Sequence, residues 1–344
     1  MVAFRCAKEI GSDFHFCTNI YSDIDFFQKR EKSCYANGRH PIIHLIEINK
    51  WKRIWLPSYF CYDVISSIQD TGIGISIYND SPSKDDINVI SQIKFSVGDV
   101  ILRMNYFGLR RWRTNEDIPV PVIEDHSHDL LGEWVTKSNA DWAIASLRKT
   151  LPIPEGGILW SPLGLSLPKI PVTTIDNELL SYKRLSAMFL KKLYISGDIF
   201  SKDEFRDLYI ETEKSLGTLP VCEISECSRF LLNKININEW YKNKIANWKV
   251  LSNMVEGYIE YLQPENLAYN NPFSFMLKFN NKKQRDVIKN KLTKNHVYPA
   301  VLWNIPDEQK DAMELANRLL SIHCDARYTR QDMERLGRII LNNI

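Results

Sequence analysis

The chain has 344 residues, of which 44% are hydrophobic and 25% are charged. This composition is typical of a globular protein, and the length suits one large domain with a smaller one. The 44 Lys and Arg residues nearly balance the 42 Asp and Glu residues. The overall charge therefore excludes the strongly basic character by which a protein binds nucleic acid or an anionic membrane.

The seven cysteines are scattered along the chain and form no C-x-x-C motif. This pattern predicts reduced thiols, with neither a disulfide framework nor a metal site. The first residues lack the apolar core of a signal peptide, and charges interrupt every long apolar run. We therefore expect a cytoplasmic protein without a membrane-spanning segment.

Short apolar segments alternate with helix-length segments from about residue 40 to residue 160. Such alternation predicts an α/β fold with a mainly parallel sheet covered on both faces. Ligands of such sheets bind beyond the carboxyl ends of the strands. The sequence predicts helices over residues 41–48 and 61–69, and strands over 54–60, 73–78, 99–106, 120–124, 142–147 and 157–160.

The second half of the chain is richer in helical periodicity. Thr329 and Asp332 form a capping-box pattern at the start of a last helix. We divide the chain into a large domain, residues 1–240, and a smaller α+β domain, residues 241–344. The other expected elements are helices over 176–192, 201–215, 282–293 and 307–320, a long helical zone over 225–262, and strands or extended segments over 273–279, 297–303 and 321–324.

A lysine, Lys149, follows the apolar segment 142–147 and precedes a proline-containing turn and the pair Gly156–Gly157. Burial at a strand end lowers the pKa of an amine, as a Schiff-base or proton-transferring lysine requires. Asp125 and His128 follow the preceding apolar segment. Each has an ordinary alternative, since Lys149 could reach solvent, Asp125 could cap a helix, and His128 could be a satisfied polar residue.

Taken together, these motifs resemble the sugar aminotransferases of the DegT/StrS type. The resemblance lies in Asp125-x-x-His128, then Ser146, then Lys149 with Gly156–Gly157 at K-x6-G-G spacing. Segments 54–59, 105–108 and 321–333 resemble further family motifs. The resemblance implies the fold of type I enzymes that use pyridoxal 5′-phosphate (PLP): a large, mainly parallel, doubly covered sheet domain and a smaller C-terminal α+β domain, assembled as a homodimer with shared active sites.

The family also implies a role for each matching residue. Lys149 corresponds to the Schiff-base lysine that later transfers a proton, and Asp125 to the carboxylate opposite the pyridine nitrogen. His128 would lie near the ring hydroxyl, and Ser146 would bind the phosphate. The turn Asn37-Gly38-Arg39 would hold the phosphate at a helix N-terminus. Cys61 occupies the position of the aromatic residue that stacks on the ring, with Tyr59, Phe60 and Tyr62 as its neighbours, and Tyr59 is the candidate for contact with the cofactor.

The family activity implied is transfer of an amino group from an amino acid, glutamate, to a nucleotide-linked keto-sugar. Surface-polysaccharide or amino-sugar biosynthesis would be the pathway, with small molecules as substrates. The alternative is a non-catalytic relative that uses the fold for binding or regulation, which the altered turn at 37–39 and the shifted Ser146 favour.

Several other residues have two interpretations each. The arginines at 103, 110, 111 and 113 could bind a nucleotide diphosphate or belong to a solvated loop. Arg148 is expected to face away from Lys149 and to form an ion pair. Trp303, with His296 and Tyr298, could close over substrate or simply pack.

Overall fold

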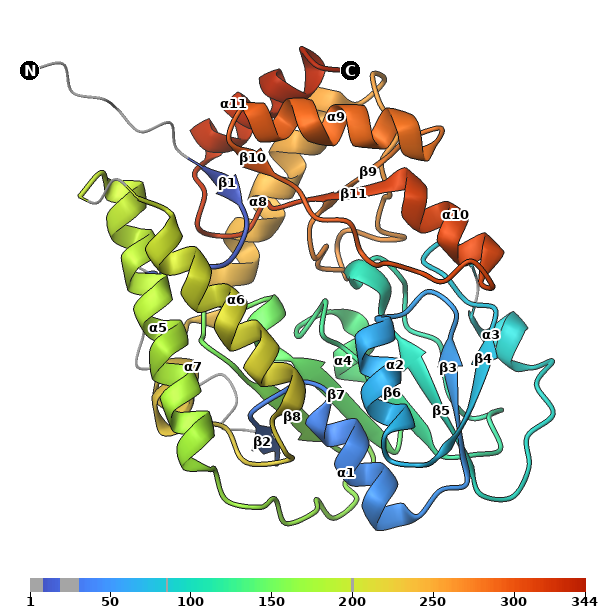
Figure 1. The fold of residues 1–344 in the computed structure, drawn as a ribbon. Coiled ribbons are helices and arrows are strands. Elements are labelled where there is room, and N and C mark those ends of the chain that lie inside the picture. Colours follow the sequence, from blue (N-terminus) through green and yellow to red (C-terminus); the bar gives the residue numbers. More distant parts are fainter. Residues whose placement is uncertain (1–8, 19–30, 85, 199–200) are drawn as a thin grey trace, which may run out of the picture.

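A computed structural model of the chain describes residues 9–18, 31–84, 86–198 and 201–344. Its centre is a seven-stranded sheet (Figure 1). In spatial order the strands are β2 (Ser33–Tyr35), β8 (Gly157–Trp160), β7 (Trp142–Ser146), β6 (Val122–Asp125), β5 (Asp99–Met104), β3 (Arg53–Pro57) and β4 (Gly74–Tyr78). β8 is antiparallel to β2 and β7, and the other paired strands run parallel.

Apolar side chains pack on both faces of this sheet. On one face Ile54 and Leu56 belong to the same core as α1 (His40–Asn49) and α2 (Tyr62–Gln69). On the other face Trp55 packs with Ile101 near the short helix α3 (Asp86–Ile90), and further along Ala143 packs near α4 (Glu133–Lys137). Successive strand residues point to opposite faces. The predicted mainly parallel, doubly covered α/β sheet is confirmed.

The helices α5 (Ile175–Ser196) and α6 (Asp203–Thr218) pack against each other beside the sheet (Figure 1). The helical zone predicted over 225–262 consists of two helices and ends at Val255. α7 (Glu226–Lys234) ends before α8 (Ile237–Val255) begins, because the Asn236 side chain caps a new helix by accepting a hydrogen bond from the Glu239 N–H.

The C-terminal residues build an α+β layer on a small antiparallel sheet, with its own apolar core. Its elements are β9 (Phe275–Lys278), α9 (Lys282–Lys294), β10 (Val297–Tyr298), α10 (Lys310–Arg318), β11 (Leu319–Ile322) and α11 (Arg330–Leu341). The N-terminal strand β1 (Ile10–Gly11) pairs in parallel with β10. The capping box of Thr329 and Asp332 is present at α11.

One helix boundary in this layer differs from expectation. The predicted helix over 307–320 spans only α10, because Leu319 and Leu320 pair with Lys278 and Leu277 of β9. Pairing with a buried strand outweighs the local helical pattern there. The division of the chain into two domains between residues 240 and 241 remains a prediction.

The described cysteines are all free thiols, and Cys6 lies outside the described residues. No helix within the described ranges is long and apolar enough to cross a membrane. In the same ranges, no cluster of three or more His, Cys, Asp and Glu side chains has a metal-binding arrangement.

Candidate active site

A cavity of about 230 Å³ lies at the carboxyl edge of the central sheet. Three of the residues predicted for the site reach it from neighbouring strands: Asp125 ends β6, Ser146 ends β7, and Lys149 follows in the turn Leu147–Lys149. The turn before α1 closes one side. The wall consists of Asn37, Gly38, Arg39, Ile42, Cys61, Asp63, Val64, Asp125, Ser127, Ser146, Arg148, Lys149, Glu213 and Trp303.

Hydrogen bonds join the ends of β6 and β7 at this cavity. One carboxylate oxygen of Asp125 accepts a hydrogen bond from the Ser127 N–H at 2.8 Å. The Ser127 hydroxyl oxygen in turn accepts the Ser146 N–H at 2.7 Å. Asp125 and Ser146 are each only 6% exposed. The carboxylate and the serine are therefore fixed relative to each other before any ligand binds.

The turn at Asn37 and Gly38 packs directly on the strand ends. A Cβ atom on Gly38 would lie 2.5 Å from Ser146 Cβ and 2.8 Å from Ser146 Cα. A Cβ atom on Gly157 would lie 2.3 Å from the Asn37 carbonyl oxygen. No side chain fits at either position, so the two glycines allow the turn, Ser146 and the start of α1 to surround one small space.

The side chains that flank Gly38 have protein partners in addition to facing the cavity. Asn37 donates from Nδ2 to the Leu216 carbonyl oxygen at 2.9 Å. Arg39 donates from Nη1 to Ser67 Oγ at 2.6 Å. The Arg39 Nε is buried and has no hydrogen-bond partner in the part of the chain that the structure describes. Arg39 thus keeps a charged donor beside the turn.

Lys149 is partly buried, with its Nζ 5.5 Å from the centroid of the Trp303 ring. The expectation that Arg148 faces away from Lys149 is wrong, since both residues line the cavity. The chain leaves the strand at Ser146 and enters a 3-10 turn, in which the alternation of a strand no longer applies. The expected ion pair is present, between Arg148 Nη2 and Glu213 Oε1 at 2.6 Å.

His128 and Tyr59 belong to an aromatic cluster beside the cavity. His128 stacks on Trp303 with 5.7 Å between ring centroids, and Tyr59 packs on Trp303 at 5.8 Å. The His128 Nδ1 accepts the Phe107 N–H at 3.1 Å. Burial, together with the charges of Lys149 and Lys244, holds the pKa of His128 well below its usual value. His128 is therefore neutral, with its proton on Nε2.

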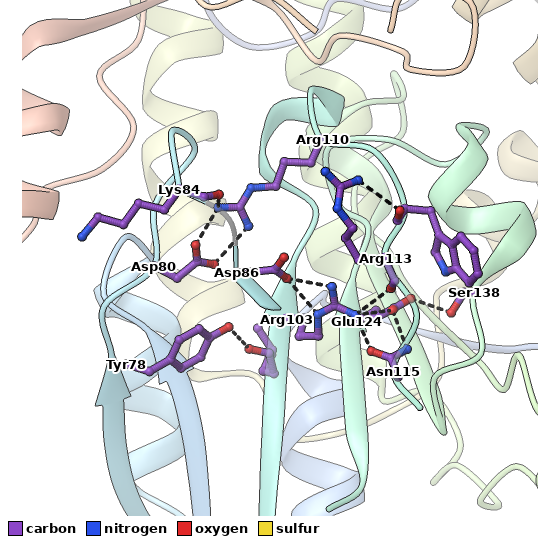
Figure 2. A network of polar contacts seen from close by, with 12 residues as sticks. Tyr78, Asp80, Lys84, Asp86, Arg103, Arg110, Arg113, Asn115, Glu124 and Ser138 are labelled. Atoms are coloured by element: carbon purple, nitrogen blue, oxygen red, sulfur yellow. Dashed lines mark hydrogen bonds and ion pairs between the residues drawn. The ribbon is translucent and has the colours of Figure 1, made fainter. Parts of the chain in front are cut away.

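Two of the four arginines at positions 103–113 form a buried network, drawn in Figure 2. Arg103 is fully buried, and its ion pairs are with Asp86 at 2.8 Å and Glu124 at 3.6 Å. Arg110 binds Asp80 with both terminal nitrogens. Both interpretations from the sequence are wrong for Arg103 and Arg110, because these guanidiniums are enclosed and paired, facing neither a ligand nor solvent.

Comparisons of the whole fold identify the architecture. The chain matches Spr1654 from Streptococcus pneumoniae in its PMP form, a protein with a provisional assignment as a sugar aminotransferase, at TM-score 0.62 and 10% identity, over 94% of this chain and 92% of that chain. It matches Helicobacter pylori PseC, an aminotransferase involved in the biosynthesis of pseudoaminic acid, at TM-score 0.61 and 12% identity, over 98% and 99%. A DegT/DnrJ/EryC1/StrS aminotransferase from Brucella abortus matches at TM-score 0.58 and 11% identity, over 92% and 87%.

The chain therefore has the fold of the DegT/DnrJ/EryC1/StrS aminotransferases, as its motifs predicted. At these identities the likeness is one of fold. No protein-family model matches the sequence. A comparison with curated proteins by sequence also finds no match.

Six residues of the cavity wall received no site role from the sequence: Ile42, Asp63, Val64, Ser127, Arg148 and Glu213. Ser127 lies inside the Asp125-x-x-His128 motif, so its position there was a usable signal. Asp63 and Val64 follow Cys61 at the start of α2. Glu213 comes from α6, where the sequence shows only helical periodicity. Nothing local marks Glu213, since its place in the wall depends on how α6 packs.

Proposed function

We propose that this chain is a PLP-dependent aminotransferase. It would transfer an amino group from an amino acid, glutamate by family analogy, to a nucleotide-linked keto-sugar in surface-polysaccharide or amino-sugar biosynthesis. The observation that carries the proposal is the convergence of Asp125, Ser146 and Lys149 on one cavity, at the sheet edge that the fold uses for ligands. The PMP and PLP forms of the matched Streptococcus pneumoniae protein support the choice of cofactor.

The residues present fit that cofactor. Gly38 packs on Ser146 and Gly157 on the Asn37 carbonyl, and this close approach brings the turn, the Ser146 hydroxyl and the Arg39 guanidinium to one cavity. These are donors suited to a phosphate dianion at the start of α1. When bound, pyridoxal phosphate supplies an electron sink for carbanion chemistry. Asp125, buried and oriented by Ser127, would hold a proton on the ring nitrogen, and Lys149 would carry the covalent attachment and move the substrate proton.

The aromatic cluster supplies a further part of the proposed site. Trp303 reaches the cavity from the segment that follows β10, while Cys61 occupies the position expected for an aromatic residue. The Trp303 ring offers an apolar face next to Lys149. His128 and Tyr59 pack against this ring, at 5.7 and 5.8 Å between centroids. We propose that His128 and Tyr59 contribute to cofactor binding by holding the Trp303 ring in place beside the cavity.

Covalent labelling of Lys149 tests the proposal. Protein purified with PLP should show the visible absorbance of a cofactor imine, and borohydride reduction should fix the label on the peptide that contains Lys149. Lys149→Ala should lose both signals and transamination. Lys137→Ala, at a lysine whose side chain is 56% exposed, is the matched control and should keep them. A label on another lysine, with normal labelling of Lys149→Ala, would overturn the assignment.

The rival function, a non-catalytic relative, gives a different result in the same measurement. The partners that Asn37 and Arg39 already have within the protein favour it, because those contacts do not need a phosphate. Such a protein would show no covalent label at saturating PLP. Retention of a buried acid and a lysine at one cavity supports the enzyme instead.

The predicted homodimer also remains a proposal, together with the cytoplasmic location. An exposed apolar stripe on α5 supports the dimer: Ile175, Leu179, Tyr182, Phe189 and Leu193 recur at spacings of three, four or seven and are 42–79% exposed. Leu179→Asp combined with Phe189→Asp should give monomers in light scattering. Asn290→Asp, on exposed surface of α9, should leave the mass unchanged. A wild-type monomer would contradict the proposal.

A further inference from the structure

A second, wider cleft of about 610 Å³ opens on the other side of Lys149. Arg148, Lys149 and Glu213 line both this cleft and the smaller cavity, so the two spaces meet at the lysine. Its remaining wall comes from segment 12–14, α5, α6 and the C-terminal layer. The apolar part of that wall consists of Phe14, Ile153, Met188, Ile210, Ala300 and Leu302.

Two guanidiniums in this cleft share one carboxylate. Glu213 Oε1 lies 2.6 Å from Arg148 Nη2, and Glu213 Oε2 lies 3.1 Å from Arg184 Nη1. The arginine side chains are 17% and 7% exposed, whereas the Glu213 side chain is 53% exposed. Burial would raise the pKa of Glu213, but the charges and hydrogen bonds of the two arginines hold this pKa below its usual value. A carboxylate thus bridges the pair from the solvent side.

The pair has only one carboxylate in close contact, that of Glu213. Burial, followed by the charge of Arg148, lowers the pKa of Arg184. The Arg148 Nε is buried without a hydrogen-bond partner among the described residues. Beyond Glu213, the nearest acid is Asp13, whose Oδ1 is 4.0 Å from Arg184 Nη2 and whose side chain is 45% exposed. Two largely buried guanidiniums at the edge of a cleft favour the binding of an anion whose oxygens accept their hydrogen bonds.

We propose that Arg148 and Arg184 form the subsite for the carboxylate of an amino-acid substrate, and that Glu213 occupies this subsite until the substrate displaces it. The inference rests on the proposed function, because it places the substrate amine next to Lys149. The carboxylate of Glu213 already spans the two arginines. The spacing of the pair therefore favours a substrate carboxylate over a diphosphate. The apolar wall at Met188, Ile210 and Leu302 would contact an aliphatic side chain.

Binding of two small anions tests the subsite without any turnover. Glutarate and pyrophosphate are titrated calorimetrically into the purified protein. We expect glutarate to bind, and Arg148→Gln and Arg184→Gln each to weaken it by roughly ten- to a hundredfold, the effect of losing a charge-assisted contact. Arg206→Gln, at an exposed arginine of α6, is the matched control and should leave the affinity unchanged.

A gain-of-affinity variant keeps the test decisive if the buried Arg184 proves necessary for folding. Glu213→Gln should tighten glutarate binding by roughly three- to tenfold, because the competing carboxylate is gone. Unchanged or weaker binding in Glu213→Gln, or equal affinity in the two arginine variants and wild type, would overturn the proposal. The proposal would also be overturned if pyrophosphate bound with higher affinity than glutarate and this binding depended on the two arginines. That result would assign Arg148 and Arg184 to a phosphorylated substrate.

The two proposals fail in distinguishable ways. Glutarate binding does not require a covalent label on Lys149. Normal labelling of Lys149 with arginine-independent glutarate binding would reject the subsite alone. Absence of labelling with arginine-dependent binding would reject the aminotransferase and, with it, the role of the pair in binding a substrate amine donor.

Discussion

Two pairs of largely buried arginines differ in the number of acceptors around each guanidinium. Arg103 has Asp86, Glu124 and the Asn115 side chain around it, and Arg110 has both oxygens of Asp80 and the Lys84 carbonyl oxygen (Figure 2). Arg148 and Arg184, by contrast, share the carboxylate of Glu213, which is half exposed. The further acceptors of Arg184 are the Thr212 hydroxyl at 3.2 Å and the exposed Asp13 carboxylate at 4.0 Å.

The difference separates a structural from a ligand-binding use of the same side chain. In the Figure 2 network the three carboxylates that pair with Arg103 and Arg110, those of Asp80, Asp86 and Glu124, are themselves buried, so these charges are fixed in place. This network holds Glu124 immediately before Asp125 on β6. In the cleft the Glu213 side chain is 53% exposed, and our proposal requires that its carboxylate turn into water and leave both arginines to an anion.

The largest expected effect on stability comes from Arg103→Met. The substitution would leave Asp86 and Glu124 buried without their cation, and removal of one partner of a buried ion pair costs about 3–5 kcal/mol. Urea unfolding followed by tryptophan fluorescence measures the loss. Arg111→Met, at an exposed arginine of the same region, should change the free energy of unfolding by at most about 0.5 kcal/mol. Equal losses in the two variants would remove the distinction between the regions.

Glu155 extends the comparison to a buried carboxylate without an arginine partner among the described residues. Burial alone would raise the pKa of Glu124, but the hydrogen bond and charge of His126, together with Arg103, lower it to about 2. At Glu155 burial prevails and raises the pKa to about 7, despite a 2.8 Å hydrogen bond from the Ser225 N–H.

A pH series of unfolding experiments tests this contrast. Between the ordinary value of 4.5 and about 7, folded Glu155 keeps a proton that the unfolded chain has released. The free energy of unfolding should therefore fall as the pH rises through this window, by about 1.4 kcal/mol per pH unit. Glu155→Gln should lose this slope and be more stable than wild type above pH 7, whereas Glu47→Gln, at an exposed glutamate, should keep it. Identical slopes in Glu155→Gln and wild type would contradict the assignment.

The smallest expected effect on stability is that of Arg148→Gln. Its ion pair with the half-exposed Glu213 is screened by water, so the free energy of unfolding should change by less than about 1 kcal/mol. The same urea titrations measure this change. A loss as large as that of Arg103→Met would show that the cleft pair is structural and would argue against its role in binding.

Local sequence patterns determined most of the elements of this protein. Apolar segments of strand length predicted β3 to β8, and the Thr329–Asp332 capping box predicted the start of α11. The order of Asp125, Ser146 and Lys149 along the chain also predicted their convergence. Parallel strands place their carboxyl ends on one edge, so residues that follow successive strands must meet there.

Tertiary packing decided the rest of the site. Trp303 and Glu213 reach Lys149 from distant segments, and Arg103 and Arg110 are buried only because β4, β5 and the loops beside them enclose their partners. No local pattern encodes such contacts, since the spacing of polar residues along the sequence is the same whether their side chains contact solvent, a carboxylate or a ligand. The sequence by itself thus predicted the fold and the meeting of an acid, a serine and a lysine at the strand ends. Which charges face the substrate depends on the packing of α5, α6 and the C-terminal layer around that edge.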